Sequence, residues 1–345
     1  MNRRIPSFVV GGIGVVLILI ALAARLFTAA PAFESLTDNF RPEMRSAELS
    51  RLRTDVNNLA AVQSEFTTKA VPQLAAAAKM TPQQFVTLLG QQYPAVAAGL
   101  QSVPTVTQQF TGVLNVLDAE QARFTKADRI PTKSLPATTV PWALVGAGGL
   151  CIVAAFFVPR RRGAAAALVL GTALVVAPLA LSLPSKAGAA DTMNSHLKPV
   201  YTAELVSGAK SSLAGMQAMG SELQTKLIPG LAQLLHQTPQ QLQGYLGSNF
   251  PAVAAGVASM PDALGRFDRL VTTFDSSLTD YNRAKKTTLV PIVWALLIAG
   301  LLVTGTAGFV LVGSASGAVA GREEHGRWRE RLAAAMPGHG HLSHR

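Results

Sequence analysis

Cysteine and charge are both scarce in this 345-residue chain, and each shortage excludes a class of protein. The single cysteine, Cys151, excludes an intrachain disulfide framework and a cysteine-based metal site. Only 14% of the residues are charged, whereas 49% are hydrophobic, which is a high share for a soluble protein. Because the apolar residues gather in four blocks, the composition indicates an integral membrane protein.

Acidic residues, lysine and histidine are missing from these four blocks, which predict transmembrane helices over residues 5–24, 140–158, 164–183 and 289–312. Each block has the roughly 20 residues that a helix needs to cross about 30 Å of hydrocarbon. Ion-coupled transporters usually carry an ionisable group near the midplane, so the sequence disfavours that class. Arg25 ends the first block, and we expect its side chain to snorkel to the outer interface.

The net charge of +11 lies mainly beside the apolar blocks and hardly at all in the two long segments between them. Arg3 and Arg4 precede the first block, Arg160, Arg161 and Arg162 separate the second from the third, and an arginine-rich tail follows Gly321. Basic residues in these places mark cytoplasmic ends. The charge therefore predicts topology, and the sequence gives no reason to expect a nucleic-acid partner.

This topology places both termini in the cytoplasm of a bacterial cell and both long loops outside its plasma membrane. A cleaved signal peptide is the alternative for the first block, but a retained anchor is favoured because the third block occupies the equivalent place in the second half. The predicted segments are an N-terminal region with the first span (1–30), a first helical hairpin (31–139), a second span (140–158), a cytoplasmic turn (159–163), a third span (164–183), a second hairpin (184–288), a fourth span (289–312) and a basic tail (313–345).

The two long loops contain an internal repeat. Residues 81–104 read TPQQFVTLLGQQYPAVAAGLQSVP and residues 238–261 read TPQQLQGYLGSNFPAVAAGVASMP, an ungapped match at an offset of 157 with 14 of 24 positions identical. Coincidence does not explain such a match, so we expect a duplication of a unit made of two spans and one hairpin.

The repeated segment predicts its own local structure. Thr81 and Thr238 should cap short helices, with proline at the first helical position and Gln84 or Gln241 completing a capping box. Glycine should end each short helix, and proline should open another short one before the chain returns to the membrane. A further pair of prolines should kink the preceding long helices. The glycines that should end the short helices are Gly90 and Gly247, and the prolines that should open the next ones are Pro94 and Pro251. The prolines that should kink the long helices are Pro72 and Pro229, and Pro104 and Pro261 are expected just before the returning helices.

Apolar residues in both loops follow alternating steps of three and four, in the same register. The outgoing stripes are Leu49, Leu52, Val56, Leu59, Phe66 and Ala70, and Val206, Ala209, Leu213, Met216, Leu223 and Leu227. The returning stripes are Val106, Phe110, Val113, Leu117 and Phe124, and Ala263, Phe267, Leu270, Phe274 and Tyr281. We predict an all-α fold in which the hairpins pair as a pseudo-twofold antiparallel four-helix bundle. Pairing between two chains, as a homodimer, is the alternative.

No residue set predicts catalysis, a cofactor or a metal site, so the protein is not expected to be an enzyme. His196 and His236 are the only histidines in the loops, and no paired carboxylates stand beside them; Asp118 and Glu120 are expected to be solvated charges. The tail histidines His325, His339, His341 and His344 could hold a transition metal, but a basic tail without metal is the favoured interpretation.

Two surfaces are predicted to meet partners. Small apolar residues around the repeated PAVAAG stretch could form a flat surface for a protein or lipid, although they could equally pack the two tips on each other; they are Tyr93, Pro94, Val96, Gly99, Phe250, Pro251, Val253 and Gly256. Basic and aromatic residues should contact lipid on the cytoplasmic side, those of the tail on a short amphipathic helix; they are Arg160, Arg161, Arg162, Arg322, Arg327, Trp328 and Arg329.

Three functions follow from these features. The leading hypothesis is a non-catalytic scaffold or accessory subunit of a bacterial envelope assembly that binds other membrane or envelope proteins through its outer bundle. The second is a component that binds or transports lipid or a hydrophobic solute in the groove between the halves. The third is an extracytoplasmic sensor without an output domain of its own.

Overall fold

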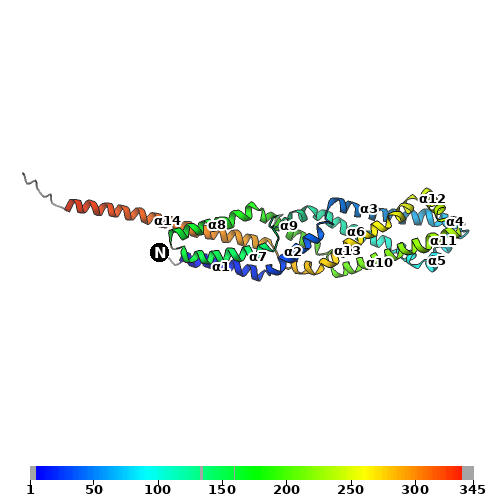
Figure 1. Cartoon of the computed structure of the whole chain (residues 1–345), viewed down its shortest axis with the longest axis horizontal. Coiled ribbons are helices and arrows are strands. Elements are labelled where there is room, and N and C mark those ends of the chain that lie inside the picture. The colour runs from blue at the N-terminus through cyan, green and yellow to red at the C-terminus, as the bar shows by residue number, and fades with distance from the viewer. Residues whose placement is uncertain (1–4, 133–134, 159, 336–345) are drawn as a thin grey trace, which may run out of the picture. The chain divides into compact units, whose positions relative to one another are not determined.

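The computed structural model describes residues 5–132, 135–158 and 160–335, with side chains described as far as Val312. The described residues are almost entirely helical and form no β-strand (Figure 1). The chain folds into two compact units, each assembled from separate stretches of the sequence. The span unit comprises Met1–Phe27, Ser134–Ala187 and Thr288–Arg345, and the loop unit comprises Thr28–Lys133 and Gly188–Thr287.

Four helices of the span unit are long and apolar enough to cross a membrane, which indicates a membrane protein. They are α1 (Ile5–Ala23), α7 (Thr139–Phe157), α8 (Arg161–Ala180) and the first part of α14 (Val290–Ala335). The span within α14 is Val290–Val312, and the bounds of all four spans differ from the predicted ones by no more than three residues. The existence of four candidate spans is therefore confirmed.

Small residues set the packing of the span unit, where α1 packs on α7 and α8 packs on α14. A Cβ atom added to Gly14 would lie 2.5 Å from the Gly148 carbonyl oxygen, and one added to Gly171 would lie 2.6 Å from the Thr304 nitrogen. Such contacts let apolar helices approach closely where no hydrophobic effect drives their association.

The loop unit is built from two series of helices that match element by element at an offset of 157. The first series is α2 (Leu26–Phe40), α3 (Ser46–Glu65), the π-helical turn η1 (Phe66–Ala70), α4 (Val71–Ala77), α5 (Pro82–Gln92) and α6 (Pro94–Ala127). The second is α9 (Leu183–Leu197), α10 (Ala203–Glu222), the π-helical turn η2 (Leu223–Leu227), α11 (Ile228–Leu234), α12 (Pro239–Asn249) and α13 (Pro251–Ala284).

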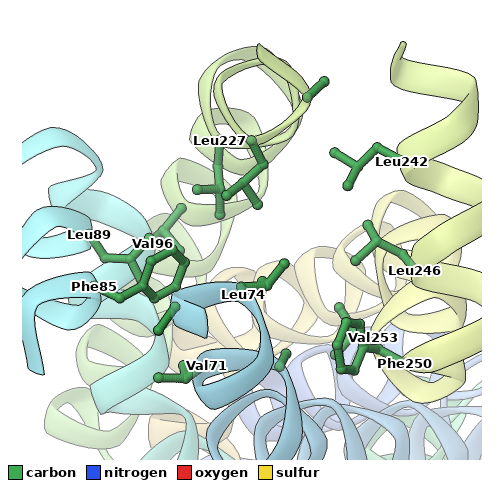
Figure 2. Packing of buried hydrophobic residues seen from close by; sticks show 14 of the residues in the cluster. Val71, Leu74, Phe85, Leu89, Val96, Leu227, Leu242, Leu246, Phe250 and Val253 are labelled. Carbon is green, nitrogen blue, oxygen red and sulfur yellow. The ribbon is translucent and has the colours of Figure 1, made fainter. Parts of the chain in front are cut away.

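Each long helix of the loop unit packs on helices from both series. α3 packs on α6 and α13, and α10 also packs on α6 and α13. The shorter helices α4, α5, α11 and α12 gather at one end of this unit (Figure 1). Side chains from both series meet there in one apolar cluster around Leu74, with Phe85 and Phe250 almost fully buried (Figure 2).

The capping boxes are confirmed at both short helices. Thr81 Oγ1 accepts a hydrogen bond from the Gln84 amide at 3.2 Å, and Gln84 Oε1 accepts one from the Thr81 amide at 2.9 Å. Thr238 and Gln241 repeat both bonds. Most residues of the predicted stripes are buried as well, including Leu52, Leu117 and Leu270.

Three local predictions were wrong. Gly90 does not end α5, which continues to Gln92, because Tyr93 precedes a proline and is therefore held out of the helical region at φ −133°. Gly247 is placed likewise inside α12, which ends at Asn249. Pro94 and Pro251 do not open short helices: each begins a helix of 34 residues that contains Pro104 or Pro261.

Two further features differ from expectation. A π-helical turn ends two residues before each of Pro72 and Pro229, and each proline lies at the start of the α-helix that follows. The predicted kinks at these prolines stay predictions. The predicted short amphipathic helix of the tail is not separate, since α14 runs unbroken to Ala335. Arg25 lies in the break between α1 and α2 with a left-handed φ of 52°.

Candidate functional site

An apolar cavity of about 100 Å³ lies inside the loop unit, among its four long helices. Its walls are mainly leucine, valine and methionine side chains from both series. One series lines it from Asp55 on α3 to Leu74 on α4, so at 1.5 Å per helical residue it extends for roughly 30 Å. A small volume spread over that length gives a narrow, elongated space.

The sequence builds this cavity by two local devices. Leu59 and Met216 belong to the predicted apolar stripes, and both line it. In the turns η1 and η2 each backbone hydrogen bond spans one residue more than in an α-helix. This rotates the apolar stripe around the helix, and Phe66 and Leu223 of these turns line the cavity. Turns of this kind are common at functional sites.

Two buried glutamates, 157 residues apart, connect the series reciprocally. Glu65, at the end of α3, accepts a 2.9 Å hydrogen bond through Oε2 from the Val253 amide in the first turn of α13. Glu222, at the end of α10, accepts hydrogen bonds of 2.7 and 3.0 Å from the Ala95 and Val96 amides in the first turn of α6. Each carboxylate thus serves a helix N-terminus of the other series, where unpaired amides and the helix dipole favour negative charge.

The charge of these glutamates is further balanced within their own helices. Lys226 Nζ lies 3.3 Å from Glu222 Oε1, and Lys69 Nζ lies 3.7 Å from Glu65 Oε1. Burial alone would raise the pKa of Glu222, but hydrogen bonds from the Val96 amide, Lys226 and the Ala95 amide outweigh it and lower the pKa. Glu222 is therefore held as a carboxylate.

Close glycine contacts bring the two series together beside the cavity. A Cβ atom at Gly99 of α6 would overlap the side chain of Met219 of α10, and one at Gly256 of α13 would overlap Val62 of α3. These are the same two positions in each series, 157 residues apart. Only glycine allows the helices to approach this closely.

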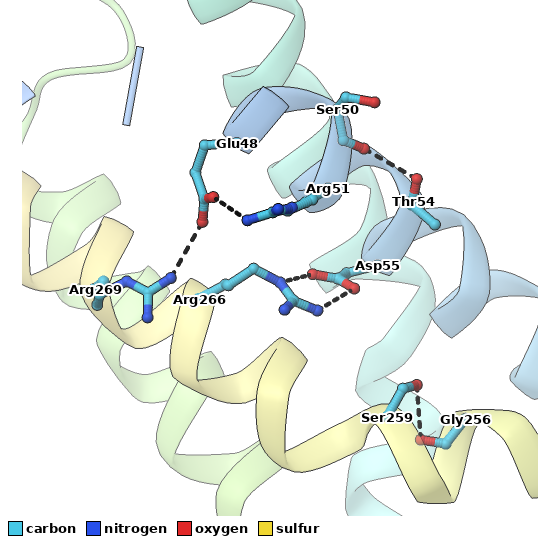
Figure 3. A network of polar contacts seen from close by, with 9 residues as sticks. All are labelled: Glu48, Ser50, Arg51, Thr54, Asp55, Gly256, Ser259, Arg266 and Arg269. Atoms are coloured by element: carbon cyan, nitrogen blue, oxygen red, sulfur yellow. Dashed lines mark hydrogen bonds and ion pairs between the residues drawn. The ribbon is translucent and has the colours of Figure 1, made fainter. Parts of the chain in front are cut away.

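A polar network crosses the α3–α13 interface (Figure 3). Arg266 donates to both oxygens of Asp55, at 2.6 Å from Nε and 2.8 Å from Nη2. Arg269 Nη2 lies 3.1 Å from Glu48 Oε1, and Arg51 lies 3.5 Å from the other oxygen of Glu48. The Asp55 pair is half-buried and bidentate, which is the geometry in which an ion pair contributes most.

The predicted partner surface is largely buried. Phe250 is fully buried, and Val96, Gly99 and Val253 are buried with it in the contacts that join the series. Tyr93 and Gly256 are partly buried, and only Pro94 and Pro251 are exposed. These residues therefore do not form a continuous exposed surface of this chain, because the small side chains serve close packing of the two tips.

Glu120 is also not the solvated charge that we expected. It is 2% exposed, and its Oε1 lies 2.5 Å from Arg123 Nη1 and 2.7 Å from His196 Nδ1, while Oε2 has no hydrogen-bond partner in the described part of the chain. Asp118 is exposed beside Arg53. No local sequence pattern predicts the contact between Glu120 and His196, because these residues are 76 positions apart.

The remaining site predictions concern lipid and metal. Arg160, Arg161 and Arg162 are exposed at the start of α8. The side chains of Arg322, Arg327, Trp328, Arg329 and His325 lie outside the described residues, as do His339, His341 and His344 entirely. Among the described residues, no three His, Cys, Asp or Glu side chains gather as a metal site.

Sequence comparison adds no relative. No protein-family model matches the chain, and no curated protein matches it. Functional interpretation therefore rests on the cavity and on the contacts around it.

Proposed function

We propose that the two loops form a pseudo-twofold antiparallel four-helix bundle within one chain, derived from a duplicated unit. The matched helix bounds and the reciprocal glutamates support this arrangement. A third observation is the contact between Phe110 and Phe267, whose ring centroids lie 4.7 Å apart. These positions are equivalent at the offset of 157, and equivalent residues touch each other only where they lie near a twofold axis.

We further propose that this bundle lies outside the plasma membrane of a bacterium, with both termini in the cytoplasm. Three basic residues support this topology, since positive charge favours the cytoplasmic side. Arg160 immediately precedes α8, and Arg161 and Arg162 are its first two residues. In this orientation the cavity belongs to the extracytoplasmic part of the protein.

The cavity supports a binding function best: we infer that it takes up the acyl chain of a lipid or a similar linear apolar molecule. Its narrow, elongated form fits one extended chain better than a compact solute. Burying each methylene of such a chain contributes about 0.8 kcal/mol, so eight methylenes would contribute about 6 kcal/mol before the costs of association. The protein would then act as a non-catalytic, membrane-anchored lipid-binding component.

The scaffold hypothesis keeps the outer bundle as a partner surface, but the residues of the repeated tip are largely buried and do not favour that tip as the contact. A scaffold role would need another face of the loop unit. We therefore place lipid binding first.

Native mass spectrometry of the full chain, purified from its own membranes into nanodiscs, tests the proposed function. We expect a bound apolar molecule that is retained after the bulk lipid is removed. Ala263→Phe, which fills the cavity from α13, should remove it. Ala60→Phe is the matched control, because Ala60 is exposed on α3. Equal retention by Ala263→Phe and the wild type would contradict the proposal.

A further inference from the structure

The cavity borders two interfaces between the series, α6–α10 and α3–α13, and these differ in how deeply their contacts are buried. At the α6–α10 interface Met219 is 4% exposed and packs on buried Gly99. At the α3–α13 interface the shorter Val62 takes the place of methionine, and both Val62 and Gly256 are partly exposed. Both side chains lie equally close to their glycines. The α3–α13 contact is nevertheless the more exposed of the two, so the cavity is less shielded from its surroundings on that side.

The polar lining of the cavity is confined to the same side. Asp55, Asn58 and Gln63 of α3 and Ser259 of α13 line it, whereas α6 and α10 contribute only apolar side chains to its wall. The equivalent positions of the other side, 157 residues away, are Ser212, Gly215, Gly220 and Ser102, and none of them is a lining residue. The polar end of a bound molecule would therefore face the α3–α13 interface.

Charged groups at this interface already satisfy one another. Asp55 pairs with Arg266, and Glu48 pairs with Arg269 and Arg51. Asn58, by contrast, is exposed and Gln63 is partly exposed, and neither side chain has a hydrogen-bond partner within the described part of the chain. An uncharged head group could bond to these amides, whereas a charged one would find the neighbouring groups of opposite charge already paired.

On the basis of the proposed function, we propose that the α3–α13 interface is the entrance of the cavity and that the ligand is a single-chain amphiphile with an uncharged hydrogen-bonding head group. Asn58 and Gln63 bind the head group, and the chain lies along Leu59, Met216 and the residues beyond them. Val62 sets the width of the entrance.

Photolabelling of the full chain in nanodiscs tests the entrance. The probe is dodecanol with a diazirine in its chain, and labelled peptides are identified by mass spectrometry. Wild type should be labelled in α3 and α13, and Val62→Met should reduce this labelling about tenfold or more because it reproduces the closed interface. Met219→Val is the matched control at the equivalent position and should retain full labelling; Val62→Leu is a milder closing variant should methionine disturb folding.

The outcomes separate the two proposals. Absence of specific labelling in the wild type overturns lipid binding itself. Strong labelling that Val62→Met and Val62→Leu leave unchanged, with both variants folded by circular dichroism, overturns only the entrance.

Competition among dodecanol, dodecanoate and dodecyltrimethylammonium tests the head group. Unlabelled dodecanol should displace the probe at concentrations about tenfold lower than either ion, and Asn58→Ala should remove most of that preference. Asn57→Ala, one residue away and not part of the cavity lining, should not. Preferential competition by dodecanoate that is lost in Arg266→Gln would instead assign an anionic head group to this place.

Discussion

The reciprocal glutamates make a sharp prediction about how the two series hold together. Replacing Glu65 with alanine removes the acceptor of the Val253 amide, which is buried in the first turn of α13. An unpaired buried donor costs about 1–3 kcal/mol, and loss of a helix N-terminal cap costs about 0.5–2 kcal/mol. These two figures describe the same lost contact, so we expect Glu65→Ala to destabilise local packing by about 2 kcal/mol.

Hydrogen–deuterium exchange of the full chain in nanodiscs measures this cost where it arises. A change of about 2 kcal/mol corresponds to roughly 30-fold faster exchange of the amides in the first turn of α13 if they exchange by local opening. Glu65→Gln should show a smaller effect, because the amide oxygen can still accept the hydrogen bond but lacks the charge that favours a helix N-terminus.

The distinguishing result is the location of the change. Glu65 lies in the first series and Val253 in the second, so the variant should accelerate exchange 188 residues away from the substitution. Glu222→Ala should likewise accelerate exchange, but from the second series to the first, at the start of α6. Faster exchange around residue 65 with no change at the start of α13 would refute the reasoning.

Three other predictions concern stability. Phe110→Ala and Phe267→Ala should each lower the free energy of unfolding by about 3–5 kcal/mol, and a double-mutant cycle by urea denaturation should give a coupling of about 1 kcal/mol; zero coupling would mean that the rings do not touch. Gly99→Ala should destabilise by about 1–3 kcal/mol through overlap with Met219, whereas Gly112→Ala, which has open space, should stabilise its helix by about 1 kcal/mol; equal effects in thermal melts would exclude close packing at Gly99. Burial raises the pKa of Glu43 above 4.5, so its ionised form opposes folding: Glu43→Gln should stabilise the protein at neutral pH, and the gain should shrink as the pH falls toward 4.5, which a gain independent of pH would contradict.

Glu222 should give the opposite dependence on pH. Its pKa is lowered in the folded protein, so the stabilisation is fully present above about 4.5 and is lost as the pH falls below that value. Because Glu43 and Glu222 should affect stability in opposite ways as the pH changes, each serves as a control for the other.

The sequence was sufficient for several features that depend on local spacing. The apolar runs predicted α1, α7 and α8 to within a few residues, and the pattern around Thr81 predicted a capping box that the structure contains. The same reasoning failed at Gly90, where the proline effect on Tyr93 decides the helix end and glycine does not. A rule about the residue before proline would have given the correct bound.

Contacts between the series could not be predicted in the same way. Glu65 and Glu222 occupy equivalent positions, and that match was a usable signal, but their partners are backbone amides more than 120 residues away. The sequence also shows that valine at position 62 corresponds to methionine at position 219. The effect of this difference on the cavity can be judged only from the structure, in which both side chains face glycines. The cavity and its polar side therefore needed the three-dimensional structure.

A cryo-electron microscopy map of the full chain, purified from its native membrane into nanodiscs, would test the central claim most directly. We expect continuous elongated density inside the loop unit, beginning at Asn58 and Gln63 between α3 and α13 and running toward Leu74. We also expect both loops of that bundle to belong to one chain. An empty cavity in a well-resolved map, or a bundle assembled from loops of two chains, would contradict this claim.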